Sequence, residues 1–186
     1  MKVKQIFLKH TIFFNLFTLI FVTAFCQCNF APKNHFQGKD FTNDPNIPQP
    51  TGFVNDFENI YSKSEEITLD SVIKDYNKRA DIQIALATFD SGMVKKDSFQ
   101  SYTLKVAQQW RVGEKEKDNG LFIGICKGYR IMYIQNGIGT AKILSDAATK
   151  SIIDTAFIPE FKKNNVYAGT LKGMEALMIT LSAKKH

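Results

Sequence analysis

Three aspartates lie at the junctions between predicted elements, and their carboxylates suit the binding of a cation. Asp56 follows a short apolar stretch, Asp118 opens an Asp-Asn-Gly tripeptide before an apolar run, and Asp146 begins a helical pattern. Carboxylate and carbonyl oxygens are the ligands that Ca²⁺ and Mg²⁺ prefer. In a mostly parallel sheet, the loops along one edge gather around ligands. We therefore expect Asp56, Asp118 and Asp146 to converge on an oxygen-only site.

Each of these aspartates also has an ordinary structural interpretation. The tripeptide at 118–120 is typical of a turn, because Asp and Asn bond the local backbone and glycine tolerates positive φ, and the spacing alone favours this interpretation. Asp56 would cap a short helix over 57–61. Asp146 would stabilise a helix N-terminus next to the capping residue Ser145. The prediction of a site rests on the three together.

Arg130 and a Gly-x-Gly tripeptide lie close to these aspartates in the sequence. The planar guanidinium of Arg130 would bind a phosphate or pair with a nearby acid, and the structural pair is the favoured interpretation. Gly137 and Gly139 do not complete a phosphate-binding motif, because Lys142 stands where a third glycine is required. A turn that needs backbone freedom is the better interpretation of these glycines.

The histidine count and the charge exclude several classes of function. The three histidines are His10, His35 and His186, all outside the expected core, which excludes a zinc site and a Ser-His-Asp or Cys-His arrangement. Without the lysines of the first ten residues, 21 basic residues stand against 18 acidic ones, a net charge near +3. These charges are dispersed, so the sequence does not indicate nucleic-acid binding.

The first 28 residues are typical of an export signal. Three lysines precede an apolar stretch over 11–25, which is too short for a membrane span and the right size for a secretory signal. We expect export across the inner membrane, to the periplasm or to a lipid anchor in the cell envelope. Cys26 and Cys28 end the segment without the usual small-residue context, so lipidation stays open. Prolines and polar residues over 29–50 predict a flexible linker.

The remaining residues, 51–183, predict one α/β domain. Apolar periodicity predicts helices over 64–79, 98–110, 145–157 and 165–183, with Pro159 as an interruption. Apolar runs predict strands over 82–89, 121–126 and 130–135. The tight Lys127-Gly128-Tyr129 turn joins the last two as a hairpin. We expect a three-layer α/β/α sandwich around a small central, mostly parallel sheet with one hairpin.

An ordered set of short motifs resembles the TPM-domain family, also called the TPM phosphatase family. The resemblance covers the chain from about Gly52 to Leu181, and the order is more specific than any single motif. The matching segments are Phe53–Asp56, Ile82–Ala85, Trp110–Gly113, Asp118–Ile123, Arg130, Asn136–Gly139, Leu144–Asp146, Ile158–Phe161 and Tyr167–Gly169.

The resemblance implies an α/β/α sandwich, often exported or tethered to a membrane. It also implies divalent-cation binding and an acid phosphatase or nucleotide-hydrolysing activity, although some members assist membrane complexes, as in photosystem repair. Asp56, Asp118 and Asp146 match the acidic loop positions of the family, and Arg130 with the glycine pair matches the neighbouring pattern.

The chain departs from the family pattern near the glycine pair. Ala141, followed by Lys142, stands where the family commonly carries an acid, and Arg111 stands where a small residue is usual. A lost carboxylate and a nearby cation should weaken a divalent-metal site.

The sequence therefore favours an exported TPM-like domain that binds Ca²⁺ or Mg²⁺ through Asp56, Asp118 and Asp146. In this hypothesis it weakly hydrolyses a phosphate ester or nucleotide, with Asp118 and Arg130 as catalytic residues. The alternative hypothesis is a non-catalytic binding or assembly module for a membrane complex of the cell envelope.

Overall fold

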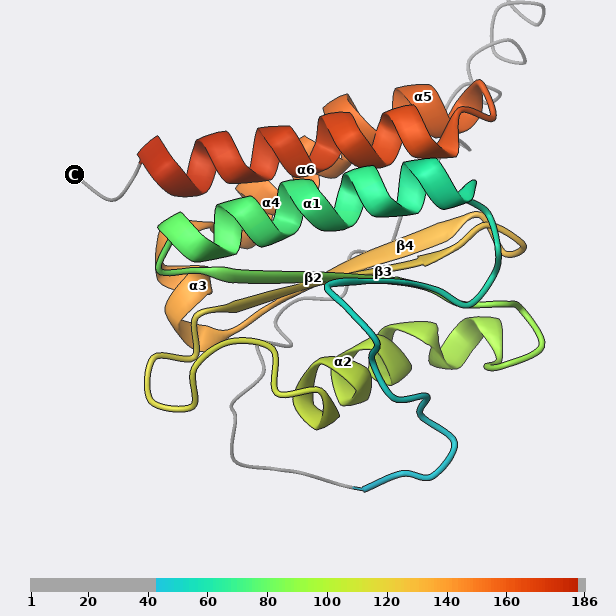
Figure 1. Ribbon diagram of the computed structural model, residues 1–186, viewed down its shortest axis with the longest axis horizontal. Coiled ribbons are helices and arrows are strands. Elements are labelled where there is room, and N and C mark those ends of the chain that lie inside the picture. The colour runs from blue at the N-terminus through green and yellow to red at the C-terminus, as the bar shows by residue number, and fades with distance from the viewer. Residues whose placement is uncertain (1–42, 184–186) are drawn as a thin grey trace, which may run out of the picture. The chain divides into compact units, whose positions relative to one another are not determined.

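The computed structural model describes residues 43–183, which contain one four-stranded sheet (Figure 1). The strands follow the chain in the order β1-β2-β3-β4, with β1, β2 and β3 parallel and β4 antiparallel to β3. This confirms the mostly parallel sheet with one hairpin. The strands are β1 (Val54–Asp56), β2 (Gln83–Thr88), β3 (Gly120–Cys126) and β4 (Ile131–Asn136).

Helices cover both faces of this sheet, as the three-layer prediction requires (Figure 1). One face carries α1, α4, α5 and α6 over a core that includes Leu69, Ile123 and Leu177. The other face carries α2 over a second core that includes Phe89 and Phe122. The helices are α1 (Lys63–Arg79), a 3-10 turn η1 (Lys96–Ser98), α2 (Phe99–Gln109), α3 (Ile138–Ile143), α4 (Asp146–Ile152), a π-helical turn η2 (Ile153–Phe157), α5 (Ile158–Lys162) and α6 (Val166–Ala183).

Helix α1 shows why the longer elements were predictable within a residue or two. The Ser62 side chain accepts the N–H of Glu65, whose carboxylate accepts the N–H of Ser62 at 2.7 Å, a capping box. Leu69, Ile73 and Tyr76 are buried at helical spacing on the core face. The capping box marks where α1 begins, and the apolar period marks the face that the tertiary packing buries.

Two short elements differ from the expectation. Strand β1 forms over residues for which we predicted no strand, before the expected helix over 57–61, and α3 forms where we expected only a turn around the glycine pair. Three residues of strand show no apolar alternation, and β1 exists because it pairs with β2 from Val54 to Asp56. Strand β1 therefore depends on a partner strand elsewhere in the chain, and its own three residues do not predict it.

Pro159 does not interrupt the helical segment that follows Ser145. The π-helical turn η2 precedes it, and Pro159 lies in the first turn of α5, where a missing N–H costs no helical bond. The wider turn directs Phe157 into the core, where it is fully buried. A Cβ on Gly173 of α6 would lie 2.1 Å from the Phe157 ring, so this close contact requires glycine.

Residues 44–48, which the sequence assigns to the flexible linker, pack against α2. The Asp44 N–H donates to Gln109 Oε1 at 2.9 Å, and the Trp110 indole N–H donates to the Pro48 carbonyl at 2.8 Å. Ile47 is only 2% exposed in the core beneath α2. The folded part of the chain therefore begins before residue 51. The predicted signal over 1–28 lies outside the described residues.

Candidate functional site

The strand register places the predicted site residues at two opposite ends of the sheet. Asp56 pairs with Thr88, and Thr88 pairs with Ile125, at the carboxyl ends of the parallel strands. Asp118 directly precedes the segment in which Gly120 pairs with Gln83, at the amino ends. The five steps from Gly120 to Ile125 span roughly 16 Å. The expectation that Asp56 converges with Asp118 is therefore wrong.

At the carboxyl end, the Asp56 carboxylate organises the turn that follows β1. It accepts the N–H of Tyr61 at 2.8 Å, the N–H of Ile60 at 3.1 Å and the hydroxyl of Thr88. The interpretation of Asp56 as the cap of a short helix over 57–61 is therefore wrong, because these residues form a turn and a loop and not a helix. The Asp56 oxygens bind donors of the protein itself.

Glu58 and Tyr129 connect the loops of this end, and the sequence analysis missed both contacts. The two oxygens of Glu58 accept the N–H groups of Lys127 and Gly128, each at 2.7 Å. The Tyr129 hydroxyl donates to the Ser91 carbonyl at 2.7 Å. Sequence separations of 69 and 38 residues leave no local signal for these bonds.

Arg130 ends the turn between β3 and β4 at the same carboxyl end. Its φ is 55°, and its N–H donates to the Lys127 carbonyl at 3.0 Å. The side chain is exposed. Because the turn lies at the opposite end of β3 from Asp118, Arg130 cannot act on a group held by Asp118.

Two buried side chains complete the carboxyl end. Cys126 is fully buried, and burial raises the pKa of its thiol, which agrees with a core residue. Burial also raises the pKa of Tyr61, whose hydroxyl lies 2.9 Å from the hydroxyl of Thr170 in α6. Both groups stay neutral at physiological pH, so they supply neither a nucleophile nor a base.

At the amino end, the loop before β3 packs tightly against the start of α3. Asp118 has a φ of 47°, and its carbonyl accepts the N–H groups of Gly139 at 2.9 Å and Thr140 at 3.3 Å. A Cβ on Gly137 would lie 2.1 Å from the Asp118 carbonyl oxygen, and one on Gly139 would lie 2.0 Å from the Lys117 carbonyl oxygen. The glycine pair therefore permits a close backbone approach.

Asn119 and Lys117 hold the loop that presents Asp118. Asn119 is buried, and its side chain accepts the Glu114 N–H at 2.6 Å and donates to the Asp81 carbonyl. The ammonium of Lys117 lies 2.9 Å from the Asp81 carboxylate and 3.1 Å from that of Glu114. These two acids raise the pKa of Lys117. Asp118 thus stands on a fixed loop.

Asp146 lies at the same end of the sheet as Asp118. Ser145 caps α4 by accepting the N–H of Ala148 at 3.3 Å, as predicted. The Asn136 amide donates to the Thr149 hydroxyl at 3.1 Å, which fixes the first turns of α4 against the end of β4. Asn136 pairs with Leu121, three residues after Asp118. The structure therefore brings two of the three aspartates to one end.

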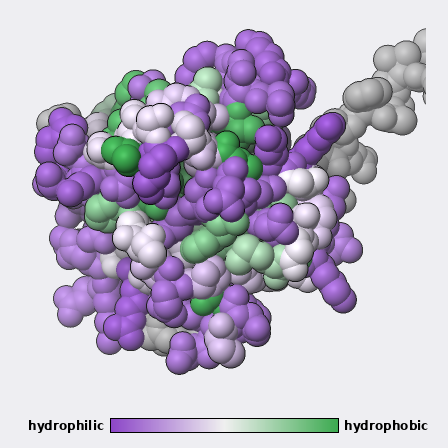
Figure 2. Space-filling view, turned by 45° about the vertical axis from the view of Figure 1, so that its right-hand side comes forward, coloured by the Kyte–Doolittle hydropathy of each residue, from purple (hydrophilic) through white to green (hydrophobic). Residues whose placement is uncertain are grey.

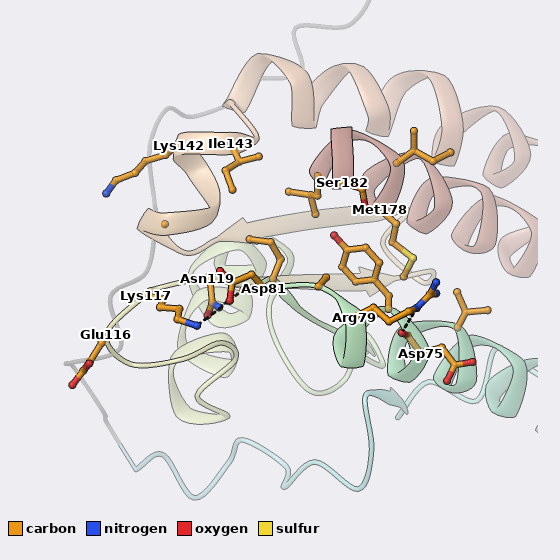
Figure 3. Close-up of a pocket in the computed structure, with 17 residues that line it drawn as sticks. Asp75, Arg79, Asp81, Glu116, Lys117, Asn119, Lys142, Ile143, Met178 and Ser182 are labelled. Atoms are coloured by element: carbon orange, nitrogen blue, oxygen red, sulfur yellow. Dashed lines mark hydrogen bonds and ion pairs between the residues drawn. The ribbon is translucent and has the colours of Figure 1, made fainter. Parts of the chain in front are cut away.

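An open pocket of about 1050 Å³ lies at this amino end (Figure 3). Lys117 and Asn119, the neighbours of Asp118, line it together with Gly139 and Lys142 of α3. The ends of α1 and α6 form the remaining walls. Within residues 43–183, no group of three or more His, Cys, Asp or Glu side chains is arranged to hold a metal ion. The amino end therefore has a pocket next to the loop that carries Asp118, although neither Asp118 nor Asp146 is among the residues that line it.

A family model for the TPM domain matches residues 54–179, which include every strand and both ends of the sheet. The chain belongs to the TPM family. This confirms the resemblance inferred from the ordered motifs. None of the curated proteins compared with the chain matches it.

Three structures solved by NMR share the fold of this TPM domain. The N-terminal domain of a protein from P. gingivalis is 24% identical, with a TM-score of 0.65 over 83% of this chain and 97% of that one. BA42 from the psychrophilic bacterium Bizionia argentinensis is 18% identical, with a TM-score of 0.60 over 68% and 85%. The N-terminal domain of cg2496 from Corynebacterium glutamicum is 15% identical, with a TM-score of 0.54 over 81% and 93%.

The described helices pack against the faces of the central sheet. Among residues 43–183, none is long and apolar enough to cross a membrane. Hydrophilic residues cover most of the face drawn in Figure 2, with apolar residues in small patches between them.

Proposed function

We propose that this TPM domain binds Mg²⁺ together with a phosphate ester at the amino end of its sheet and slowly hydrolyses the ester. One observation supports this most directly. The register of β3 and β4 brings Asp118 and Asp146 to one end of the sheet, beside an open pocket, while Asp56 lies at the other end.

The number of carboxylates favours Mg²⁺ over Ca²⁺. Ca²⁺ takes six to eight oxygen ligands, whereas Mg²⁺ is commonly held by one or two carboxylates, several waters and the phosphate oxygens of a substrate. Asp118 and Asp146 supply two carboxylates, and Ala141 stands where the resemblance leads one to expect a third. Binding of Mg²⁺ should therefore strengthen when a phosphate is present.

The cations near the pocket come from α3 and from the loop before β3. Lys142 and Lys117 both line it, and because Lys117 already pairs with Asp81 and Glu114, Lys142 takes the role of Arg130 in neutralising a phosphate. A bound Mg²⁺ would polarise the phosphoryl group and orient the attacking water. Asp118 would hold the ion, and Asn119 would keep the Asp118 loop in position through its bonds to Glu114 and Asp81.

The proposal places this activity outside the inner membrane. The basic and apolar residues over 1–28 support export, and Cys26 or Cys28 offers a point for a lipid anchor. The substrate would then be a phosphate ester of the periplasm or cell envelope.

Hydrolysis of a generic phosphomonoester or ATP by the purified chain, with and without Mg²⁺, tests the proposal. We expect turnover that requires the ion, is lost in Asp118→Asn and is retained in the matched variant Asp56→Asn. Turnover that is unchanged in Asp118→Asn would contradict the role of this residue.

A non-catalytic binding or assembly module for a membrane complex of the cell envelope is the second candidate. It is supported by Ala141, since two carboxylates bind an ion less firmly than three. Calorimetric titration separates the two candidates, because ion binding without turnover of any phosphate ester is the result expected of a module.

A further inference from the structure

The pocket at the amino end has far more room than a phosphate requires. Its volume of about 1050 Å³ is roughly 35 times the share of one water molecule in the liquid. Lys117, Asn119, Gly139 and Lys142 are four of the residues that line it, and others come from α1 and α6. The pocket therefore has room for a larger group beside the phosphate position that the proposed function assigns.

The rest of the pocket has an apolar wall built from three helices. Val72 and Tyr76 come from α1, Ile143 from α3, and Met178 and Ile179 from α6. Ile179 is 70% exposed, and α6 carries no charged residue from Ala176 to Ala183. Val72, Ile143 and Met178 are half-buried and Tyr76 is buried, so this wall is a partly covered apolar surface. Apolar surface that lines a pocket favours an apolar ligand group, and methionine adapts to varied shapes.

The polar groups on this wall already have partners within the protein. The Tyr76 hydroxyl hydrogen-bonds with Ser182, and burial raises the pKa of Tyr76. The Arg79 Nε donates to the Asp75 carbonyl at 3.0 Å within α1 (Figure 3). The pocket thus has a charged side, where Lys117 pairs with Asp81 and where Glu116 and Lys142 also line it, and an apolar side.

We propose that this pocket selects phosphate monoesters whose leaving group is an apolar chain. The phosphate lies toward Lys142 and Asn119, and the alkyl group of the ester lies along Tyr76, Ile143 and Met178. This inference rests on the proposed function for the position of the phosphate. In hydrolysis, water supplies the hydroxyl that bonds to phosphorus and the proton that leaves with the alcohol as the ester P–O bond breaks.

Two phosphonates that cannot be hydrolysed test the selection directly. Hexylphosphonate and methylphosphonate share a headgroup, so calorimetric titration of the purified chain with each, in Mg²⁺, isolates the effect of five methylene groups. We expect hexylphosphonate to bind about tenfold tighter or more, since each buried methylene favours binding. Equal affinities, or no binding of either compound, would overturn the proposal.

Variants of the apolar wall test where the alkyl group of the ligand lies. Ile179→Gln and Met178→Gln should each reduce the preference for hexylphosphonate several-fold, while Ile67→Gln should leave it unchanged. Ile67 is the matched control because it is an exposed isoleucine of α1 that does not line the pocket. If both α6 variants keep the preference for hexylphosphonate, the alkyl group does not lie along α6. Ile179 is exposed, so Ile179→Gln still gives a valid test if Met178→Gln unfolds.

Turnover separates a failure of this inference from a failure of the proposed function. Tight binding of hexylphosphonate without hydrolysis of hexyl phosphate supports the pocket's selectivity and contradicts hydrolysis. Hydrolysis of hexyl phosphate and methyl phosphate with equal kcat/KM supports the activity and contradicts the selectivity.

Discussion

The two ends of the sheet both carry aspartates, but they use them differently. At the carboxyl end, Asp56 and Glu58 accept five hydrogen bonds from donors of neighbouring loops. At the amino end, Asp118 and Asp146 lie beside a pocket, and the loop is held by Asn119 and Lys117. Acids at loop junctions therefore fasten the loops at the carboxyl end, whereas at the amino end the printed contacts of the loop come from the side chains on either side of Asp118.

Alanine at Gly139 should have the largest effect of the variants that distinguish the two ends. Its Cβ would lie 2.0 Å from the Lys117 carbonyl oxygen, and backbone cannot easily move away. We expect a loss of about 3 kcal/mol in the free energy of unfolding, measured by denaturant titration.

Gly128→Ala is the matched control at the carboxyl end. Its Cβ would lie 3.1 Å from the Ser91 hydroxyl, which belongs to a side chain that can rotate. We expect a loss below about 1 kcal/mol. Equal losses at the two glycines would show that the close packing is not specific to the amino end.

Glu58→Gln should destabilise the fold without changing ligand binding. The amide replaces one of the two oxygens that accept the N–H groups of Lys127 and Gly128, so we expect a loss of about 1 to 2 kcal/mol. Thermal unfolding measures this loss, and calorimetry with Mg²⁺ and phosphate should give an unchanged affinity. Weakened binding in this variant would move the site to the carboxyl end.

Two salt-bridge networks should affect how stability depends on pH, one on the acid limb of the stability curve and one on its alkaline limb. Lys172 and Lys163 hold the pKa of Glu160 below 4.5, so this pairing stabilises the fold above pH 4.5 and is lost as the pH falls through the folded pKa. Asp81 and Glu114 raise the pKa of Lys117 above 10.5, so its contribution is present below pH 10.5 and is lost as the pH rises through the folded pKa.

The lysines of both networks are exposed to solvent, although the Glu160 side chain is only 12% exposed, so we expect these to be the smallest effects. Melting temperatures across the pH range measure them. Glu160→Gln should flatten the acid limb, and Lys117→Gln should flatten the alkaline limb. An acid limb that is unchanged in Glu160→Gln, or an alkaline limb that is unchanged in Lys117→Gln, would contradict the assignment.

The sequence predicted most of the fold because the long elements carry their own signals. The capping box at Ser62 and the apolar period of α1 are local, and so is the apolar run of β3. Strand β1 and helix α3 depend instead on pairing with β2 and on close approach to Asp118. Such contacts join residues far apart in the chain and leave no local period.

The candidate site was predicted only in part, for a reason that the topology makes clear. Asp56 follows a strand and Asp118 precedes one, and in parallel strands these junctions lie at opposite ends. The sequence therefore already indicated that Asp56 and Asp118 lie at opposite ends of the sheet. The contacts of Glu58 with the turn after β3 were not predictable, because they span 69 and 70 residues.

One matched pair of variants decides whether the ion and the phosphate bind at the amino end. Calorimetric titration with Mg²⁺ in the presence of phosphate would compare Asp118→Asn with Asp56→Asn. We expect Asp118→Asn to weaken binding by about tenfold or more, since one of two charged ligands is lost, and Asp56→Asn to keep the original affinity. Loss of affinity in Asp56→Asn with full affinity in Asp118→Asn would contradict binding at the amino end.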